Sequence, residues 1–175
     1  MTIREKTMLG YPLDTSEAIS LAELPLLELG RLAHPVRERL HARLVYLGES
    51  RVEEFSSRLS VRECIERLIE IRGAGYRSVA PVVTAEPGQT TGEQEIRLIA
   101  LARLILDTVP HIAADWTRLS SATAQISLRF GADTLCGLPG DLPLKEIERH
   151  VQEAGLQLAE TPPARAPLDP LRVLA

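Results

Sequence analysis

The spacing of apolar and polar residues predicts helices at the start of the chain. A capping signal at Asp14 precedes apolar residues at helical spacing, which predicts a short helix over residues 14–23. A second helix is expected over residues 26–41, with an interruption at Pro35. Its expected apolar stripe consists of Leu26, Leu29, Leu32, Val36 and Leu40. Residues 1–43 therefore form an N-terminal helical segment in this prediction.

Strand and helix signals alternate after this segment. Residues 44–47 are a β-prone run that Gly48 closes, and Ser60 with Glu63 forms a capping box that opens a helix ending near Gly73. Residues 76–84 then predict a strand. Pro81 within it cannot donate a backbone hydrogen bond, so we expect an edge, a bulge or a strand end there.

The second half continues the alternation. Thr91 and Gln94 offer another capping box, and the helix after them is apolar around most of its circumference over residues 96–106. Such a helix packs on more than one side. Residues 111–116 predict a strand, and residues 120–130 predict a helix that ends at Gly131.

The last predicted helix covers residues 144–154, preceded by Pro143 and ended by Gly155. Alternating strands and helices are typical of β/α units with parallel strands. A closed eight-stranded barrel takes about 250 residues, and this chain has 175. We therefore expect an α/β fold: a partial β/α barrel or a small parallel sheet over residues 44–160, in one structural domain with a proline-rich tail over residues 161–175.

The composition fits an ordinary globular protein, with 45% hydrophobic, 25% charged and 3% aromatic residues. A formal net charge of -4 offers no broad positive field for nucleic acid or an anionic membrane surface. No apolar run reaches the roughly 20 residues of a membrane helix, and Met1 is not followed by a signal-peptide pattern. We expect a cytoplasmic protein that binds neither membranes nor nucleic acid.

The metal-binding residue types are scattered along the sequence. Cys64 and Cys136, the only two cysteines, lie far apart and are expected to be reduced structural thiols. The four histidines show no ligand-like spacing. We expect no metal site.

Two blocks of the sequence resemble one enzyme family. Residues 22–41 (AELPLLELGRLAHPVRERLH) are similar to the N-terminal helical segment of the radical S-adenosylmethionine enzymes of menaquinone biosynthesis, aminofutalosine synthase and cyclic dehypoxanthine futalosine synthase, and of the deazaflavin-forming synthases. Residues 101–116 (LARLILDTVPHIAADW), with residues 124–125 and 130–135, resemble the last barrel units of the same enzymes. The blocks occur in the family's order.

The resemblance extends to shorter pieces. Gly75, Tyr76, Val79, Pro81 and Pro87 look like a late barrel strand and its outgoing loop. Residues 146–155 look like the terminal helix. The resemblance implies a truncated relative of a triosephosphate-isomerase-type barrel.

One departure from the family concerns its cofactor. In the family, a C-x-x-x-C-x-x-C loop after the first strand holds a [4Fe–4S] cluster through three thiolates, and the cluster binds S-adenosylmethionine. Here residues 44–47 are followed by Gly48, Glu49 and Ser50, with no cysteine before Cys64. The sequence therefore predicts no iron–sulfur cluster, no S-adenosylmethionine binding and no radical catalysis by this chain alone.

Ligands of parallel-strand folds bind at the carboxyl ends of strands. The residues expected at such ends are Glu49, Thr84, Glu86, Asp115, Trp116, Asp133 and Thr134. The competing structural interpretation is that Glu49 and Glu86 are solvated loop acids, that Asp133 accepts local backbone hydrogen bonds after Gly131, and that Trp116 packs at the end of the sheet. We predict no catalytic residues.

Three functions remain open at this stage. The leading hypothesis is a non-catalytic accessory protein of the futalosine pathway that binds a small molecule or a protein partner. The partner would be a second copy of the chain, with residues 96–106 or 26–40 at the homodimer contact, or a full-length radical enzyme. The second is a cluster-independent enzyme acting on a futalosine-like substrate. The third is a degenerate paralogue with no selected role.

Overall fold

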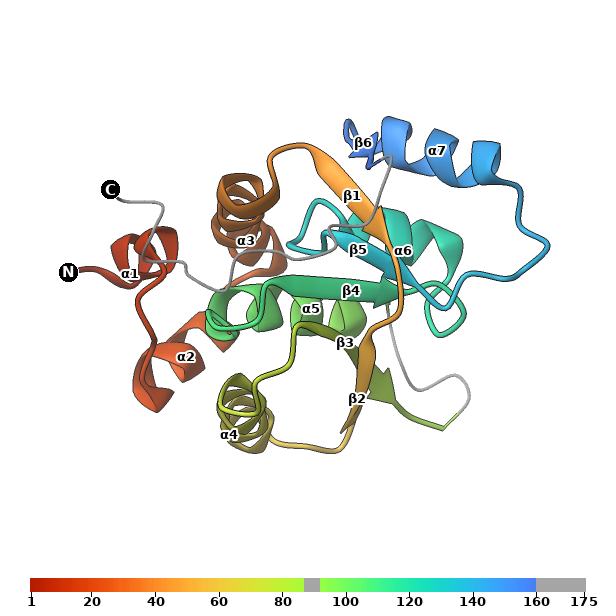
Figure 1. Cartoon of the computed structure of the whole chain (residues 1–175). Helices are drawn as coiled ribbons and strands as arrows, with labels where there is room; N and C mark the ends of the chain where they lie inside the picture. The colour runs from red at the N-terminus through yellow and green to blue at the C-terminus, as the bar shows by residue number, and fades with distance from the viewer. Residues whose placement is uncertain (87–91, 160–175) are drawn as a thin grey trace.

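Six parallel strands form a single sheet in the order β2-β3-β4-β5-β1-β6 (Figure 1). The computed structural model describes residues 1–86 and 92–159. The strands are β1 (Leu44–Leu47), β2 (Arg51–Ser56), β3 (Ser78–Thr84), β4 (His111–Asp115), β5 (Thr134–Cys136) and β6 (Gln157–Leu158). The prediction of an α/β fold with a parallel sheet is confirmed.

Seven helices accompany the sheet in the described residues. They are α1 (Ile3–Leu9), α2 (Thr15–Ala22), α3 (Leu26–His41), α4 (Val61–Arg72), α5 (Gly92–Ile105), α6 (Ser121–Ser127) and α7 (Leu144–Glu153). The capping box at Ser60 is formed as predicted, and the predicted capping signal at Asp14 belongs to a second capping box with Glu17. Thr91 of the third predicted box, Pro87 and the tail over residues 161–175 lie outside the described residues. No helix of the described part of the chain is long and apolar enough to cross a membrane.

The sheet curls strongly, because β1 and β2 are joined by only Gly48, Glu49 and Ser50 although three strands separate them in the sheet order. Four strand spacings of about 4.8 Å would place them about 19 Å apart in a flat sheet. The chain from Leu47 to Arg51 can span at most about 14 Å. Figure 1 shows this segment crossing in front of β4.

Ser50 closes the curl. Its hydroxyl lies 2.6 Å from the Ser78 hydroxyl at the start of β3 and also hydrogen-bonds the Cys136 thiol of β5. Small side chains fill the enclosed inner face: Ala80, Ala113 and Cys136 form a buried cluster against which Val52 packs. The inner face is thus filled by the chain itself.

Helix α5 is the centre of the outer face, which carries the main core. It packs against α2, α3, α4 and α6 and against strands β3 and β4, and nine of its residues are buried: Ile96, Leu98, Ile99, Ala100, Leu101, Ala102, Arg103, Leu104 and Ile105. This confirms the expectation that the helix packs on more than one side.

Two predictions for the helix over residues 26–41 were wrong. Helix α3 runs through Pro35 without a break. Leu40, which was expected on the buried apolar stripe, is exposed, whereas the charged Arg37 is buried. Pro81 lies within β3 and pairs with Glu53 of β2, at a position where β3 is an edge on its β4 side, as expected. It is tolerated there because the β3–β4 ladder pairs only Ser78 and Val79 of β3 and ends before Pro81.

Candidate functional site

The residues predicted at strand carboxyl ends fall into two groups. As expected, Thr84 and Asp115 are the last residues of β3 and β4. Glu49, Glu86 and Trp116 lie just after β1, β3 and β4. Asp133 and Thr134 were placed wrongly. Asp133 precedes β5 and Thr134 is its first residue, so both lie at the opposite, amino end of the sheet. The missed strand β5 caused this error.

Asp133 is the centre of a buried ionic cluster at the amino end. Its Oδ1 accepts hydrogen bonds from the Arg103 guanidinium and, at 2.8 Å, from the Ile112 amide. Its Oδ2 lies 2.6 Å from His111 Nδ1 and accepts from the Thr134 hydroxyl at 3.0 Å. Both carboxylate oxygens are therefore occupied.

The arginines of this cluster are anchored by backbone carbonyls. Arg103 donates to the carbonyl of Gly131 at 2.8 Å and to that of Pro110 at 3.2 Å. Arg37, fully buried, donates to the carbonyl of Ala132 at 3.0 Å and to two further carbonyls at the start of β1. Desolvation lowers the pKa of both guanidinium groups, opposed by the charge of Asp133. The cluster ties α3 and α5 to the amino ends of β1, β4 and β5.

Two histidines complete the ionic cluster. The rings of His41 and His111 are 4.9 Å apart, and Tyr46 packs edge-on against both. Burial lowers the pKa of His41 to about 4, although the charge of Asp133 opposes this shift. Burial alone would raise the pKa of Asp133, but Arg103, the hydrogen bond from His111 and the charge of His41 hold it well below its usual range.

This arrangement corrects the expectation that no histidines cluster, since potential ligand atoms of His41, His111 and Asp133 lie within 4.8 Å of one another. Metal binding requires free lone pairs on those atoms. His41 Nε2 lies 2.8 Å from the Pro110 carbonyl oxygen, an acceptor, so this nitrogen carries a proton. With Asp133 saturated by Arg103, the geometry favours a structural ion-pair network.

At the carboxyl end, Asp115 stabilises its own turn. Its Oδ1 accepts from the amide and hydroxyl of Thr117, at 3.0 and 2.8 Å, and from the Arg118 amide at 3.2 Å. Gly137 faces this carboxylate with φ +61°, and a Cβ there would lie 2.3 Å from Asp115 Oδ1. Asp115 is thus an acceptor within its own turn, the role that the sequence interpretation had given to Asp133.

The other predicted strand-end residues do not converge on one site. Glu49 is exposed, and Glu86 lies 3.3 Å from Arg58 at the surface. Trp116 is 9% exposed and packs edge-on against His150, as the structural interpretation expected. No shared pocket of Glu49, Asp115 and Asp133 exists, because Asp133 lies at the other end of the sheet.

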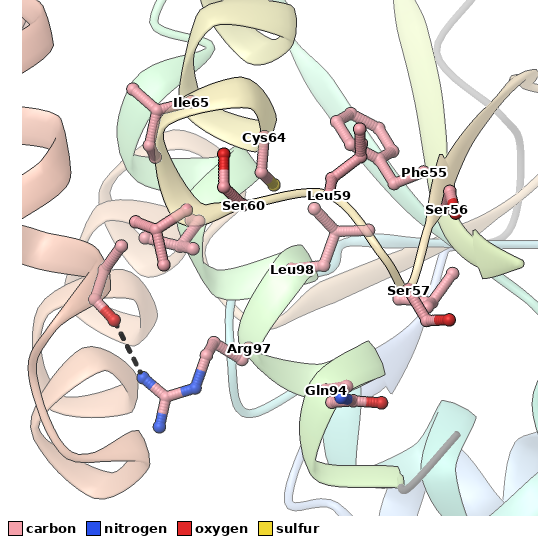
Figure 2. Close-up of a pocket in the computed structure, with 14 residues that line it drawn as sticks. Phe55, Ser56, Ser57, Leu59, Ser60, Cys64, Ile65, Gln94, Arg97 and Leu98 are labelled. Carbon is pink, nitrogen blue, oxygen red and sulfur yellow. Dashed lines mark hydrogen bonds between the residues drawn. The ribbon is translucent and has the colours of Figure 1, made fainter. Parts of the chain in front are cut away.

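A pocket that sequence reasoning missed lies at the carboxyl ends of β2 and β3, on the outer face (Figure 2). It measures about 210 Å³, and its walls come from β2, β3, α4, α5 and the end of α2. In Figure 2, Phe55, Leu59, Cys64 and Leu98 gather at its centre, while Arg97 points away toward α2. The only sequence signal nearby was the Ser60 capping box, which marks where α4 begins.

Comparisons with known proteins identify the lineage of the chain. Residues 79–156, from β3 to beyond α7, match the family model "CofH/MqnC C-terminal region". Aminodeoxyfutalosine synthase of Thermus thermophilus is 31% identical over 122 residues, which cover 63% of this chain and 32% of that enzyme. Cyclic dehypoxanthine futalosine synthase of Streptomyces coelicolor is 30% identical over 129 residues, which cover 69% of this chain and 30% of that enzyme. This chain is a relative of these radical S-adenosylmethionine enzymes.

The similarity covers only part of this chain and only part of each relative. A 5-amino-6-(D-ribitylamino)uracil--L-tyrosine 4-hydroxyphenyl transferase 2 of Methanosarcina barkeri is 45% identical over 49 residues, or 27% of this chain and 13% of the transferase. The chain spans about a third of the length of the two futalosine-pathway relatives.

The stretch that matches the family model contains the ionic cluster's Arg103, His111 and Asp133. It does not contain the pocket residues of β2 and α4, which precede residue 79.

Proposed function

We propose that this chain is a non-catalytic relative of the futalosine-pathway radical enzymes and acts by binding, as an accessory protein. The observation that carries the proposal is the segment after β1. The resemblance places a cluster-binding cysteine loop there, whereas here Gly48, Glu49 and Ser50 lead directly into β2. A three-residue connection that also closes the sheet leaves no room for a cluster loop.

The two thiols of the chain do not replace that loop. Cys64 lines the pocket on the outer face, and Cys136 belongs to the buried cluster on the inner face. Burial raises the pKa of each thiol to about 11, and the charge of Asp115 adds to the effect at Cys136. Iron–sulfur clusters are held by thiolates, so two remote protonated thiols support the absence of a resident cluster.

The filled inner face supports the same proposal. Ala80 and Ala113 are fully buried and Cys136 is 4% exposed, so at these positions the concave side of the sheet is covered by other described residues. Small barrels likewise have interiors filled by side chains. Binding must then use the outer surface or the outer-face pocket.

Turnover of S-adenosylmethionine tests the proposal. The reconstituted chain is incubated anaerobically with S-adenosylmethionine and dithionite, and 5′-deoxyadenosine is quantified. We expect no product above a protein-free control, while the Thermus thermophilus relative treated identically serves as the positive control. Product that disappears in the Cys64→Ala variant would refute the non-catalytic role.

An accessory protein needs a contact surface, and we propose that α3 provides it in a homodimer or in a complex with a full-length radical enzyme. The apolar residues of α5 are buried within one chain, so residues 96–106 have little surface to offer. Helix α3 exposes Leu27 at 70% and Leu40 at 39%.

Light scattering of the chain alone should report twice the 19.3 kDa of one protomer. The double variant Leu27→Glu and Leu40→Glu should halve that mass, and Leu144→Glu on α7 should not. A wild-type mass of one protomer at micromolar concentration would exclude the homodimer, and co-purification with a full-length radical enzyme would then test the other partner.

A further inference from the structure

We infer that the pocket between α4 and α5 is a binding site for a small uncharged molecule that combines one apolar ring with one hydrogen-bonding group. The inference deepens the proposed binding role and rests on it. It gives that role a location. The β2 and α4 walls of the pocket lie outside the stretch that the family model matches.

The pocket lies where parallel α/β folds bind ligands. Phe55 and Ser56 are the last residues of β2, and Val83 is the penultimate residue of β3. The chain then diverges into α4 on one side and α5 on the other. Sites at the carboxyl ends of strands, where the following helices separate, are the general rule for such sheets.

The deep part of the pocket is apolar. The side chains of Phe55, Ile65 and Leu98 are buried at its base, and Leu59 and Val83 add partly buried aliphatic surface. Cys64 contributes its sulfur to the same wall (Figure 2). An apolar ring or chain would gain free energy by replacing water against this surface.

The pocket offers no unpaired charge to a ligand. Among the described residues that line it, Arg97 is the only charged one. Its guanidinium donates to the carbonyls of Ala22 at 3.3 Å and Leu24 at 2.6 Å, and it lies 3.3 Å from Glu93. An ionic ligand would lose its hydration without gaining a free counter-charge, so a neutral ligand is favoured.

Polar groups at the rim can bind one neutral polar atom. The hydroxyl of Ser60 is committed to the α4 capping box through Glu63. The Ser57 hydroxyl and the Gln94 carboxamide form no hydrogen bonds with other described residues, and they line the end of the pocket near the start of α5 (Figure 2). The amide can donate or accept, which suits an alcohol or a carbonyl.

The volume sets the size of the ligand. An engineered apolar cavity of about 150 Å³ in another protein binds benzene, whereas pockets for drug-sized ligands begin at about 300 Å³. At about 210 Å³ this pocket fits a single six-membered ring with a short substituent. It is too small for a helix or a peptide strand of a protein partner.

Three matched probes test this inference: toluene, benzyl alcohol and benzoate. Binding is followed by amide chemical shifts in NMR spectra of the full chain. We expect saturable shifts in the end of β2, in α4 and in α5 with benzyl alcohol, and at least tenfold weaker binding of benzoate. Benzoate binding as tightly as benzyl alcohol would contradict the uncharged site, and no saturable shift with toluene or benzyl alcohol would contradict the site itself.

A variant pair isolates the polar rim. Gln94→Ala should weaken benzyl alcohol about fivefold, the effect of one lost neutral hydrogen bond, and should leave toluene unchanged. Gln152→Ala, an exposed glutamine on α7, is the control and should change neither. Equal effects of the two variants would overturn the assignment of Gln94.

Failure of the pocket and failure of the proposed function are distinguishable. No probe binding together with no 5′-deoxyadenosine would refute the pocket alone, whereas 5′-deoxyadenosine formation would refute the non-catalytic role whatever the probes show.

Discussion

The two ends of the sheet use acidic residues in opposite ways. At the amino end, Asp133 is fully buried and accepts hydrogen bonds from Arg103, His111 and the backbone amide of Ile112 in β4. At the carboxyl end, Asp115 bonds only to the two residues of its own turn, and Glu54 pairs with Arg118 at the surface. Charge at the amino end stabilises tertiary structure, whereas at the carboxyl end it shapes local turns.

The difference follows from solvation. A buried carboxylate without partners is costly, so Asp133 requires a full set of donors, and removing it leaves Arg103 buried and unpaired. A half-exposed pair such as Glu54 and Arg118 is solvated by water and screened by salt. The carboxyl end can therefore change in sequence at little cost in stability, which makes it the more suitable place for a ligand site.

The largest expected effect comes from breaking the ionic cluster. Asp133→Ala should lower the free energy of unfolding by about 3–5 kcal/mol, because it leaves a buried guanidinium without its counter-charge. Urea unfolding measures the change. Glu28→Ala, which breaks an exposed pair with Arg31, is the control and should cost at most about 1 kcal/mol. Equal losses in the two variants would erase the contrast between buried and exposed charge.

The pH dependence of stability should report the same cluster. The pKa of His41 is lowered to about 4 in the folded chain, so between pH 6.5 and pH 4 only the unfolded state takes up this proton. Stability is therefore complete above pH 6.5 and falls by up to about 3 kcal/mol as pH drops to 4. The lowered pKa of Asp133 acts in the same direction below about pH 3.8.

The variant His41→Gln isolates this contribution. Its stability, from urea unfolding at pH 7 and pH 4.5, should depend on pH by about 2–3 kcal/mol less than that of the wild type. An identical pH dependence in both proteins would show that His41 titrates alike in the folded and unfolded states.

A smaller effect is expected at the carboxyl end. Gly137→Ala introduces a Cβ 2.3 Å from Asp115 Oδ1 at a left-handed φ of +61°, so it should cost about 2 kcal/mol. Gly140→Ala meets nothing within 4 Å and should change stability by less than about 0.5 kcal/mol. Thermal unfolding of the pair checks this, and equal melting temperatures would contradict the close contact between Gly137 and Asp115.

Local signals in the sequence predicted local structure. The capping boxes at Asp14 and Ser60 involve residues three apart, and both are formed. The apolar circumference of residues 96–106 predicted correctly that α5 is packed on several sides. Strand β2 was missed because its sequence, RVEEFS, alternates charged and apolar residues only weakly.

The ionic cluster and the pocket could not be predicted from such signals. His41 and His111 are brought together by the packing of α3 on the sheet. Asp133 hydrogen-bonds Arg103, which lies thirty residues earlier in the sequence. The pocket depends on how far α4 and α5 separate, a property of packing that no motif encodes. The same holds for the curl of the sheet, which follows from a three-residue connection between β1 and the unpredicted β2.

Iron binding tests the central claim most directly. The full chain is reconstituted anaerobically with iron and sulfide, desalted and analysed for iron content and for the electron paramagnetic resonance signal of a reduced cluster. We predict only traces of iron and no signal, because the connection from β1 to β2 consists of Gly48, Glu49 and Ser50 and contains no cysteine. About four irons per chain with a cluster signal would contradict the account.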